Sequence, residues 1–171
     1  MLLIEPAVHG DARGFFLESF NQKDFAKATG LCANFVQDNH SRSSKGVLRG
    51  LHYQIGRPQG KLVRVVQGAV FDVAVDLRRS SKTFMKSVST ELTGDNHKQL
   101  WIPPGFAHGF VVLSDFADVI YKTTDYYAPE HERCIRWDDP SLAIAWPPGI
   151  SPLLSPRDSN GDLLSQCLLP D

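Results

Sequence analysis

The chain has 171 residues, and 18 lysines and arginines against 19 aspartates and glutamates give a formal net charge of −1. A length of this order is typical of one domain, so we expect residues 1–171 to form a single domain. The near-neutral charge provides no basic field for nucleic acid or anionic lipid, and no apolar run reaches the ~18 residues of a membrane-spanning helix. Neither nucleic acid nor a membrane is expected as a partner.

The three cysteines, Cys32, Cys134 and Cys167, are odd in number and show no paired spacing. Free thiols in a reducing compartment are the simplest interpretation of this pattern. The first residues also lack the basic start and the long apolar segment of a secretory signal. We therefore expect a cytoplasmic protein.

Taken in chain order, the sequence predicts one short helix and then a series of strands. Residues 21–30 combine an asparagine cap, good helix formers and a glycine stop, which predicts a helix. Period-two alternation predicts strands at residues 61–68, 69–77, 86–92, 99–102, 107–113 and 117–123. Gln67-Gly68 predicts a tight turn, residues 114–116 predict a hairpin, and residues 161–169 of the Pro-rich tail are a candidate helix. Short strands separated by turn residues indicate an all-β sandwich or barrel.

The first chemically distinctive segment is Arg-Gly-Leu-His-Tyr-Gln at residues 49–54, followed by Gln-Gly-Lys at 59–61. On a regular strand, alternation directs Arg49 to one face and His52 to the other. His52 has a plain structural interpretation as a hydrogen-bonded core histidine. Lys61 is harder to explain in that way, because a lysine at the edge of an apolar strand is rarely buried unless it is paired or functional.

Two further segments stand out. Residues 103–110, Pro-Pro-Gly-Phe-Ala-His-Gly-Phe, form a rigid corner that leads into a strand, and a structural role for His108 is a hydrogen bond within that turn. In residues 121–127, Tyr126 and Tyr127 fit an ordinary core position as well as a functional one. Tyr121 lies on an apolar strand, where a buried phenol needs a hydrogen-bond partner or a function.

Histidines on separate strands of a small barrel raise the question of a metal, and the sequence resembles the cupin barrels in outline. The opening of the first cupin motif is present up to His52, but the position of the second histidine holds Gln54, and no glutamate follows before Gly68. The second motif is present as Pro103-x-Gly105-x-x-His108. Two imidazoles without a carboxylate or thiolate would hold a transition metal weakly, so we expect no metal.

A metal-free barrel that presents His, Tyr and Lys suits proton transfer at a carbon next to a carbonyl. The histidine serves as general base, the phenol as general acid, and the ammonium stabilises the enolate oxygen. Removal of the proton on one face and its return on the other is the chemistry of an epimerase. A carboxylate should orient the histidine, and spacing leaves Asp72, Asp76 and Asp158 as candidates.

Six segments, in order along the chain, resemble the dTDP-4-dehydrorhamnose 3,5-epimerases: residues 35–41, 47–54, 59–63, 71–78, 101–110 and 121–123. The similarity extends from about Glu5 to Asp158. It implies a cupin-like jelly-roll barrel with short peripheral helices, which works as a homodimer without a cofactor. The implied reaction inverts C3 and C5 of dTDP-4-keto-6-deoxy-D-glucose to give dTDP-4-keto-L-rhamnose, on the way to dTDP-L-rhamnose.

The resemblance also implies roles for individual residues. By position in the motifs, His52 is the base, Asp158 its carboxylate partner, Tyr121 the acid on the opposite face, and Lys61 the cation near the enolate and the substrate. Further substrate contacts implied in the same way are Arg13, Glu18, Gln37, Asn39, Arg49, His108, Glu132 and Arg157. Arg13 and Glu18 would serve the pocket of the neighbouring subunit.

Two alternatives remain open at the level of the sequence. Relatives within the family invert only C3 or only C5 of a modified deoxysugar, and a chain of this kind would share the same motifs. A nucleotide-sugar binding module without catalysis would share the fold, but the retention of His52, Lys61, Tyr121 and Asp158 argues against it.

Overall fold

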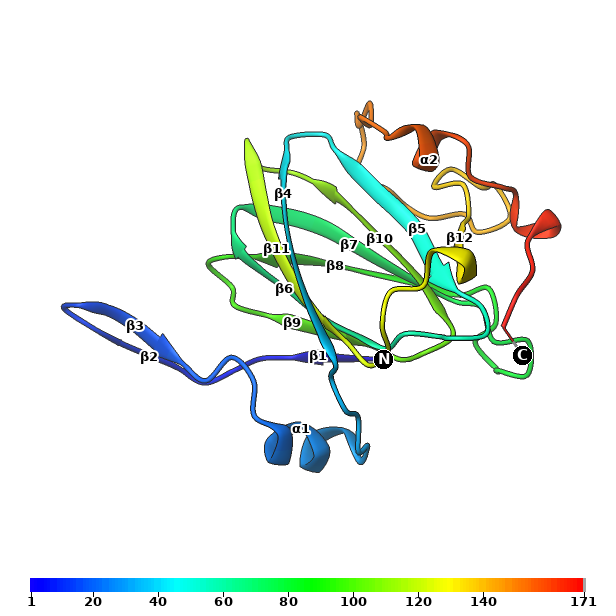
Figure 1. The fold of residues 1–171 in the computed structure, drawn as a ribbon. Coiled ribbons are helices and arrows are strands. Elements are labelled where there is room, and N and C mark those ends of the chain that lie inside the picture. Colours follow the sequence, from blue (N-terminus) through cyan, green and yellow to red (C-terminus); the bar gives the residue numbers. More distant parts are fainter. Residues whose placement is uncertain (171) are drawn as a thin grey trace.

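Two five-stranded antiparallel sheets face one another in the computed structural model, which describes residues 1–170 (Figure 1). The first sheet has the order β1 (Leu2–Ile4), β9 (Gln99–Ile102), β6 (Lys61–Gln67), β11 (Phe116–Thr123) and β4 (Gln37–Ser44). The second sheet has the order β12 (Glu132–Cys134), β5 (Leu48–Gln54), β10 (Phe106–Val112), β7 (Ala69–Asp76) and β8 (Ser87–Thr93). The predicted all-β fold is confirmed.

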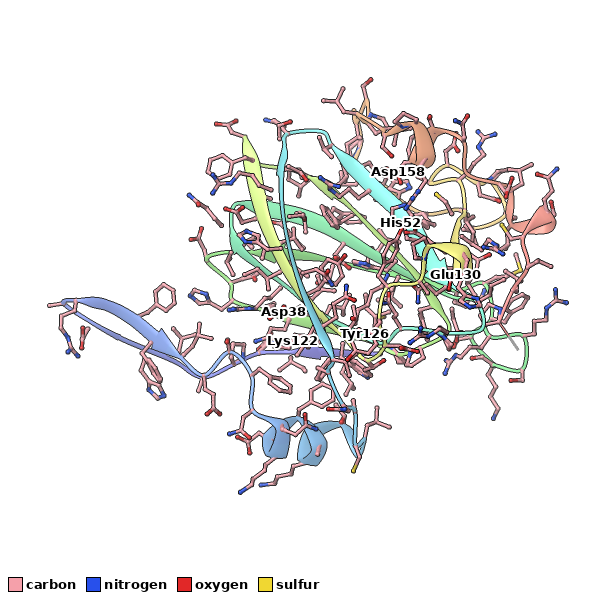
Figure 2. The ribbon with its side chains drawn as sticks, viewed as in Figure 1. Asp38, His52, Lys122, Tyr126, Glu130 and Asp158 are labelled. Atoms are coloured by element: carbon pink, nitrogen blue, oxygen red, sulfur yellow. The ribbon has the colours of Figure 1, made fainter. Side chains whose placement is uncertain are left out.

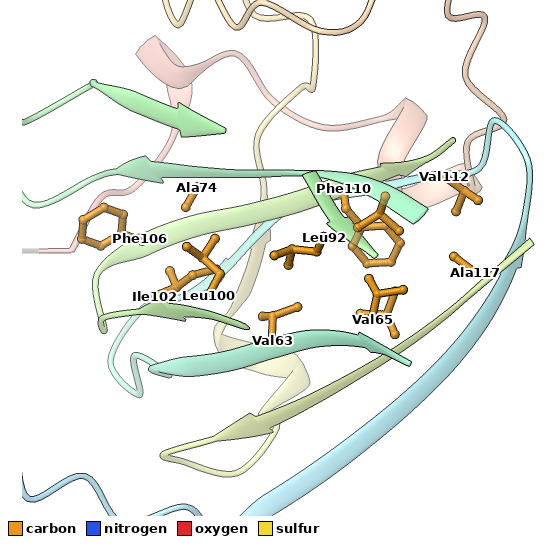
Figure 3. Packing of buried hydrophobic residues seen from close by; sticks show 12 residues of the cluster. Val63, Val65, Ala74, Leu92, Leu100, Ile102, Phe106, Phe110, Val112 and Ala117 are labelled. Carbon is orange, nitrogen blue, oxygen red and sulfur yellow. The ribbon is translucent and has the colours of Figure 1, made fainter. Parts of the chain in front are cut away.

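The core lies between the sheets and is built from the inward-facing apolar side chains of both (Figure 3). Val63 and Val65 of β6 meet Leu92 of β8 and Phe110 of β10, and all four are at most 4% exposed. Burial of one such side chain contributes about 1.5–3 kcal/mol to stability. The alternation that identified the strands in the sequence therefore reflects their inner faces.

Consecutive strands often lie in different sheets, and this overturns one prediction. Residues 107–113 and 117–123 were expected to form a hairpin, but β10 pairs with β5 and β7, whereas β11 pairs with β4 and β6. The turn at Gln67-Gly68 likewise carries the chain from β6 in one sheet to β7 in the other. Turn residues show where the chain reverses, and in a jelly roll a reversal commonly changes sheets.

The N-terminal hairpin stands apart from the two sheets. Its strands, β2 (Val8–Asp11) and β3 (Gly14–Leu17), hydrogen-bond only to one another, and Figure 1 shows them projecting from the body of the molecule. Helix α1 (Gln22–Thr29) follows. The side chain of Asn21 accepts hydrogen bonds from the first-turn amides, and Gly30 ends the helix with φ of 71°. The helix predicted at residues 21–30 is confirmed.

The C-terminal segment differs from the expectation. Instead of a helix at residues 161–169, it forms only the single 3₁₀ turn η2 (Leu164–Gln166), after the short helix α2 (Pro156–Ser159). Ser155 caps α2 and Pro156 occupies its first turn, a combination that favours a helix start. A further 3₁₀ turn, η1 (Pro129–His131), precedes β12. No helix within residues 1–170 has the length and apolar character to cross a bilayer.

Candidate active site

A cavity of about 140 Å³ lies between the two sheets and collects most of the predicted catalytic residues. Its walls are formed by Ser41, Arg49, His52, Lys61, His108, Phe110 and Tyr121. The imidazoles of His52 and His108 come from β5 and β10 of the second sheet, whereas Lys61 and Tyr121 come from β6 and β11 of the first. A ligand in this cavity therefore meets the imidazole of His52 and the phenol of Tyr121 from opposing sheets.

His52 is held by the carboxylate of Asp158. Its Nε2 lies 2.6 Å from Oδ1 of Asp158, and Figure 2 shows the two side chains next to one another. Oδ1 of Asp158 also accepts a hydrogen bond from the amide of Gly50, while Oδ2 accepts one from the hydroxyl of Ser155. Burial raises the pKa of Asp158, but the hydrogen bonds from His52 and Ser155 outweigh it and bring the pKa to about 2. The carboxylate is thus ionised at neutral pH, and with Nε2–H donating to it, Nδ1 of His52 carries the free lone pair.

The structure corrects the predicted faces of β5. Arg49 and His52 were expected on opposite faces, but both line the cavity. His52 on β5 pairs with His108 on β10, and Arg49 on β5 pairs with Phe110 on β10. The two pairs are therefore three residues apart along β5 but only two residues apart along β10. This bulge adds one residue to β5 and reverses the alternation between Arg49 and His52.

The bulge brings the two backbones together at glycine. A Cβ on Gly109 would lie 2.7 Å from the carbonyl oxygen of Arg49 and 2.9 Å from the side chain of Leu51. A Cβ on Gly50 would lie 2.5 Å from Cα of Gly109. Only glycine at both positions allows the strand that carries His52 to pack against the strand that carries His108.

We expect Gly109→Ala to destabilise the protein by about 1–3 kcal/mol, because the added methyl group must push β5 and β10 apart. Thermal unfolding followed by circular dichroism measures this. Gly10→Ala is the matched control, since its Cβ would meet no atom closer than 3.8 Å. An unchanged melting temperature for Gly109→Ala would show that the strands tolerate the separation.

Of the two remaining catalytic candidates, Lys61 is buried and Tyr121 is partly buried. Lys61 is 8% exposed, and burial lowers the pKa of its ammonium to about 8, so the group is cationic at neutral pH and loses its charge in mildly alkaline solution. Its Nζ lies 3.4 Å from the carbonyl oxygen of His52. Burial, followed by the charge of Glu132, raises the pKa of Tyr121 above its usual value. The phenol therefore stays protonated and can act as a donor.

The other carboxylate candidates have different partners. Asp72 is fully buried and both of its oxygens lie within 3.0 Å of Nε2 of His108, so the second histidine of the cavity wall is also paired with an aspartate. Asp76 binds Arg78, Ser81 and Thr83 in a turn. Sequence spacing did not reveal the pair at His108, because its members lie on neighbouring strands 36 positions apart.

The predicted polar contacts on β4 lie close to Tyr121. Asn39 pairs directly with Tyr121 across the sheet and accepts a hydrogen bond from Gln37. The buried Nδ2 of Asn39 and the hydroxyl of Ser41 have no hydrogen-bond partner within the described chain. Unsatisfied buried polar atoms beside a cavity are suited to a polar ligand. Ser41 was not identified from the sequence, although it continues the inward-facing alternation of Asn39.

Near the cavity, Glu132 of β12 accepts hydrogen bonds from Tyr127 and Arg157. By contrast, Arg13 and Glu18 belong to the N-terminal hairpin region and do not line the cavity. The side chain of Arg13 is 90% exposed and binds Asp11 within the same hairpin. Glu18 lines a separate cavity of about 390 Å³ at the base of the hairpin. Within one chain, the predicted substrate contacts therefore fall into two groups.

Comparison with known protein families identifies the family of the chain. A sequence model described as dTDP-4-dehydrorhamnose 3,5-epimerase matches residues 1–166, which is nearly the whole chain. The chain belongs to the dTDP-4-dehydrorhamnose 3,5-epimerase family. It is therefore an isomerase of the epimerase class, as the resemblance in its motifs predicted.

Individual members of the epimerase family resemble the chain over nearly its full length. A dTDP-4-dehydrorhamnose 3,5-epimerase of Pseudomonas aeruginosa is 62% identical over 161 residues, covering 94% of this chain and 89% of that protein. The crystal structure of RmlC from Legionella pneumophila in complex with dTDP-4-keto-L-rhamnose matches with a TM-score of 0.96 at 56% sequence identity. The match covers 98% of this chain and 91% of the RmlC chain. ChmJ, a 3′-monoepimerase from Streptomyces bikiniensis in complex with dTDP-quinovose, matches with a TM-score of 0.93 at 36% sequence identity. The match covers 98% of this chain and 87% of the ChmJ chain. The predicted cupin-like jelly roll is confirmed.

The two histidines that the chain keeps from the cupin metal motifs, His52 and His108, line the same cavity. His52 and His108 are each bound to a different aspartate. Within residues 1–170, one group of three residues has metal-ligand chemistry and close spacing: His52, Cys134 and Asp158, whose donor atoms all lie within 4.8 Å of one another. Burial raises the pKa of the Cys134 thiol to about 12, so the resting group is a thiol and not a thiolate. A metal-independent reaction remains our prediction.

Proposed function

We propose that the epimerase inverts C3 and C5 of dTDP-4-keto-6-deoxy-D-glucose and forms dTDP-4-keto-L-rhamnose for dTDP-L-rhamnose synthesis. The observation that carries the proposal is the cavity in which His52, paired with Asp158, faces Tyr121 of the opposing sheet. Membership of the 3,5-epimerase family supports the same substrate. The 62% identity to a 3,5-epimerase, against 36% to a 3′-monoepimerase, favours inversion at both carbons over inversion at one.

In the mechanism we propose, Nδ1 of His52 removes the proton from the carbon next to the C4 carbonyl, and the electron pair moves onto the carbonyl oxygen. The ammonium of Lys61 stabilises that enolate oxygen. Tyr121 then donates its phenolic proton to the same carbon from the other face, which inverts it. The imidazolium releases its proton to solvent and the phenolate takes one up, so the protein returns to its starting state. The C4 carbonyl acidifies both C3 and C5, and one set of groups can therefore serve both inversions.

We propose that the nucleotide half of the substrate is bound by the remaining predicted contacts. Arg49 is suited to the diphosphate, because a guanidinium can donate two parallel hydrogen bonds to phosphate oxygens. Its exposed position at the cavity, with Nε bound to Ser43, supports this role. Gln37, Asn39, His108, Glu132 and Arg157 complete the proposed contacts. A chain of net charge −1 can bind a dianion in this way, because only the pocket must be positive.

The test is proton NMR of dTDP-4-keto-6-deoxy-D-glucose in deuterated water with the purified protein. We expect deuterium at both C3 and C5 and a product with the L-rhamno configuration, and treatment with a chelator should not prevent either. Deuterium at one carbon alone would identify a single-site epimerase. Deuterium at neither carbon would contradict the proposed function.

Asp158→Asn should lower turnover by about 10²–10⁴-fold, because an amide favours the wrong imidazole tautomer and cannot stabilise the imidazolium. The substitution also bears on stability. The folded-state pKa of about 2 lies below the ordinary 3.8, so the carboxylate stabilises the fold above about pH 4 and loses that contribution as the pH falls towards 2. Acid denaturation of Asp158→Asn should lack this component. Near-normal kcat in the variant would contradict the orienting role.

We infer a homodimer in which each N-terminal hairpin reaches the pocket of its neighbour. Phe15 and Phe16 on the hairpin are 63% and 71% exposed, and large aromatic groups exposed together are suited to a protein interface. The separation of Arg13 and Glu18 from the cavity within one chain supports the same arrangement.

Mixing two inactive variants tests the shared site. If Arg13→Ala and His52→Ala dimers exchange subunits, each mixed dimer contains one pocket with both residues intact, and activity should return to about a quarter of the native value. The control mixture of His52→Ala and Asp158→Asn should stay inactive, because both residues belong to the same barrel. Equal behaviour of the two mixtures would contradict the shared pocket.

We further propose that residues 1–171 act as one domain in the cytoplasm. The two sheets bury a common core, which supports a single folding unit. Cys32, Cys134 and Cys167 are free in the described residues, which is consistent with a reducing compartment.

A further inference from the structure

We propose that Cys134, His52 and Asp158 form a binding site for a zinc-like divalent cation, and that occupation of this site reversibly inhibits the epimerase. Binding by these three side chains is independent of the proposed function. Inhibition rests on the proposed function, because a bound cation stops turnover only if His52 is the base.

The fold places three different ligand types together. Cys134 on β12 is the direct antiparallel partner of His52 on β5, and directly paired residues direct their side chains to the same face of a sheet. The capped helix α2 brings Asp158 to the same point, with Oδ1 2.6 Å from Nε2 of His52. The sulfur, nitrogen and oxygen donors all lie within 4.8 Å of one another.

The donor set selects the class of cation. Sulfur and imidazole nitrogen favour zinc and similar borderline or soft ions over magnesium and calcium, which prefer oxygen. Three protein ligands leave one tetrahedral position for water. Cys134 is available as a ligand, since the only hydrogen bond of its sulfur among the described residues is a weak one to the carbonyl oxygen of its neighbour Ile135, at 3.7 Å.

Binding would remove the base by shifting a proton. In the resting pair, Nε2–H of His52 donates to Asp158 and Nδ1 holds the lone pair. When the cation takes Nε2, the imidazole stays neutral only if its proton moves to Nδ1, so the lone pair needed for catalysis is lost. The thiol of Cys134 releases its proton to solvent as the sulfur–metal bond forms. The ion therefore blocks catalysis without entering the substrate cavity.

The experiment titrates the purified native protein with zinc chloride and follows deuterium exchange into the keto sugar. We expect one zinc ion per chain, loss of exchange, and full recovery on addition of a chelator. Cys134→Ser should keep its basal activity and bind zinc at least about tenfold more weakly. Cys167→Ser, which removes another partly buried thiol outside the cluster, should behave like the native protein. Equal zinc sensitivity of the two variants would overturn the proposal.

Cobalt binding separates the site from its consequence. A thiolate-to-cobalt charge-transfer band in the near ultraviolet should form in the native protein and in Cys167→Ser, and be lost in Cys134→Ser. Absence of the band in the native protein would overturn the site. A band that forms while deuterium exchange continues would overturn inhibition but not the binding site.

Discussion

His52→Ala should abolish epimerisation to within the limit of detection, with a loss of at least about 10²–10⁴-fold in kcat. The other imidazole of the cavity, that of His108, is paired in the same way with the buried Asp72, so the size of the loss shows whether His108 can replace His52 as the base. Deuterium exchange into the substrate should disappear together with turnover, since proton removal is the step that fails. Rates of product formation and of exchange, measured on the same sample, test this.

The control for this substitution is His40→Asn. The side chain of His40 is 59% exposed and binds Asp118, which keeps its ion pair with Arg42 in the variant. We expect near-native kinetics. A His52→Ala protein with the native fold and native turnover would contradict the assignment of the base.

Tyr121→Phe should separate exchange from inversion. The imidazole can still remove the proton and return a deuteron from solvent on the same face, so exchange should fall by less than about tenfold. Inversion needs a donor on the opposite face, and its loss should reach about 10²-fold or more. Comparison of deuterium content with product stereochemistry measures both rates.

Tyr126→Phe is the matched control, because its ring is 55% exposed and does not line the cavity. It should exchange and invert at native rates. If Tyr121→Phe instead loses exchange and inversion in equal proportion, the phenol takes part in proton removal, and the division of roles proposed here is wrong.

The sequence identified the strands well but not their partners. Alternation of apolar residues reports which side chains face the core, and it located β6, β7, β9 and β11 to within a residue or two. Pairing depends on which sheet each strand enters, and that is decided by packing between segments far apart in the chain. The hairpin expected across residues 114–116 was wrong for this reason.

In the candidate active site, too, the sequence identified individual residues but not their partners in space. His52, Lys61 and Tyr121 were identified from short motifs, and the structure brings them to one cavity. The partner of His52 lies 106 positions away, and only the resemblance to a family distinguished Asp158 from the other carboxylates. The face of Arg49 was predicted wrongly, because one extra residue in a bulge reverses the alternation and leaves no separate mark in the sequence.

A crystal structure with a bound dTDP-keto sugar tests the central claim most directly. We expect the sugar ring between the two sheets, with Nδ1 of His52 about 3–3.5 Å from C3 or C5 on one face and the phenolic oxygen of Tyr121 at a similar distance on the other. A ring that contacts both groups through the same face would contradict the proposed mechanism.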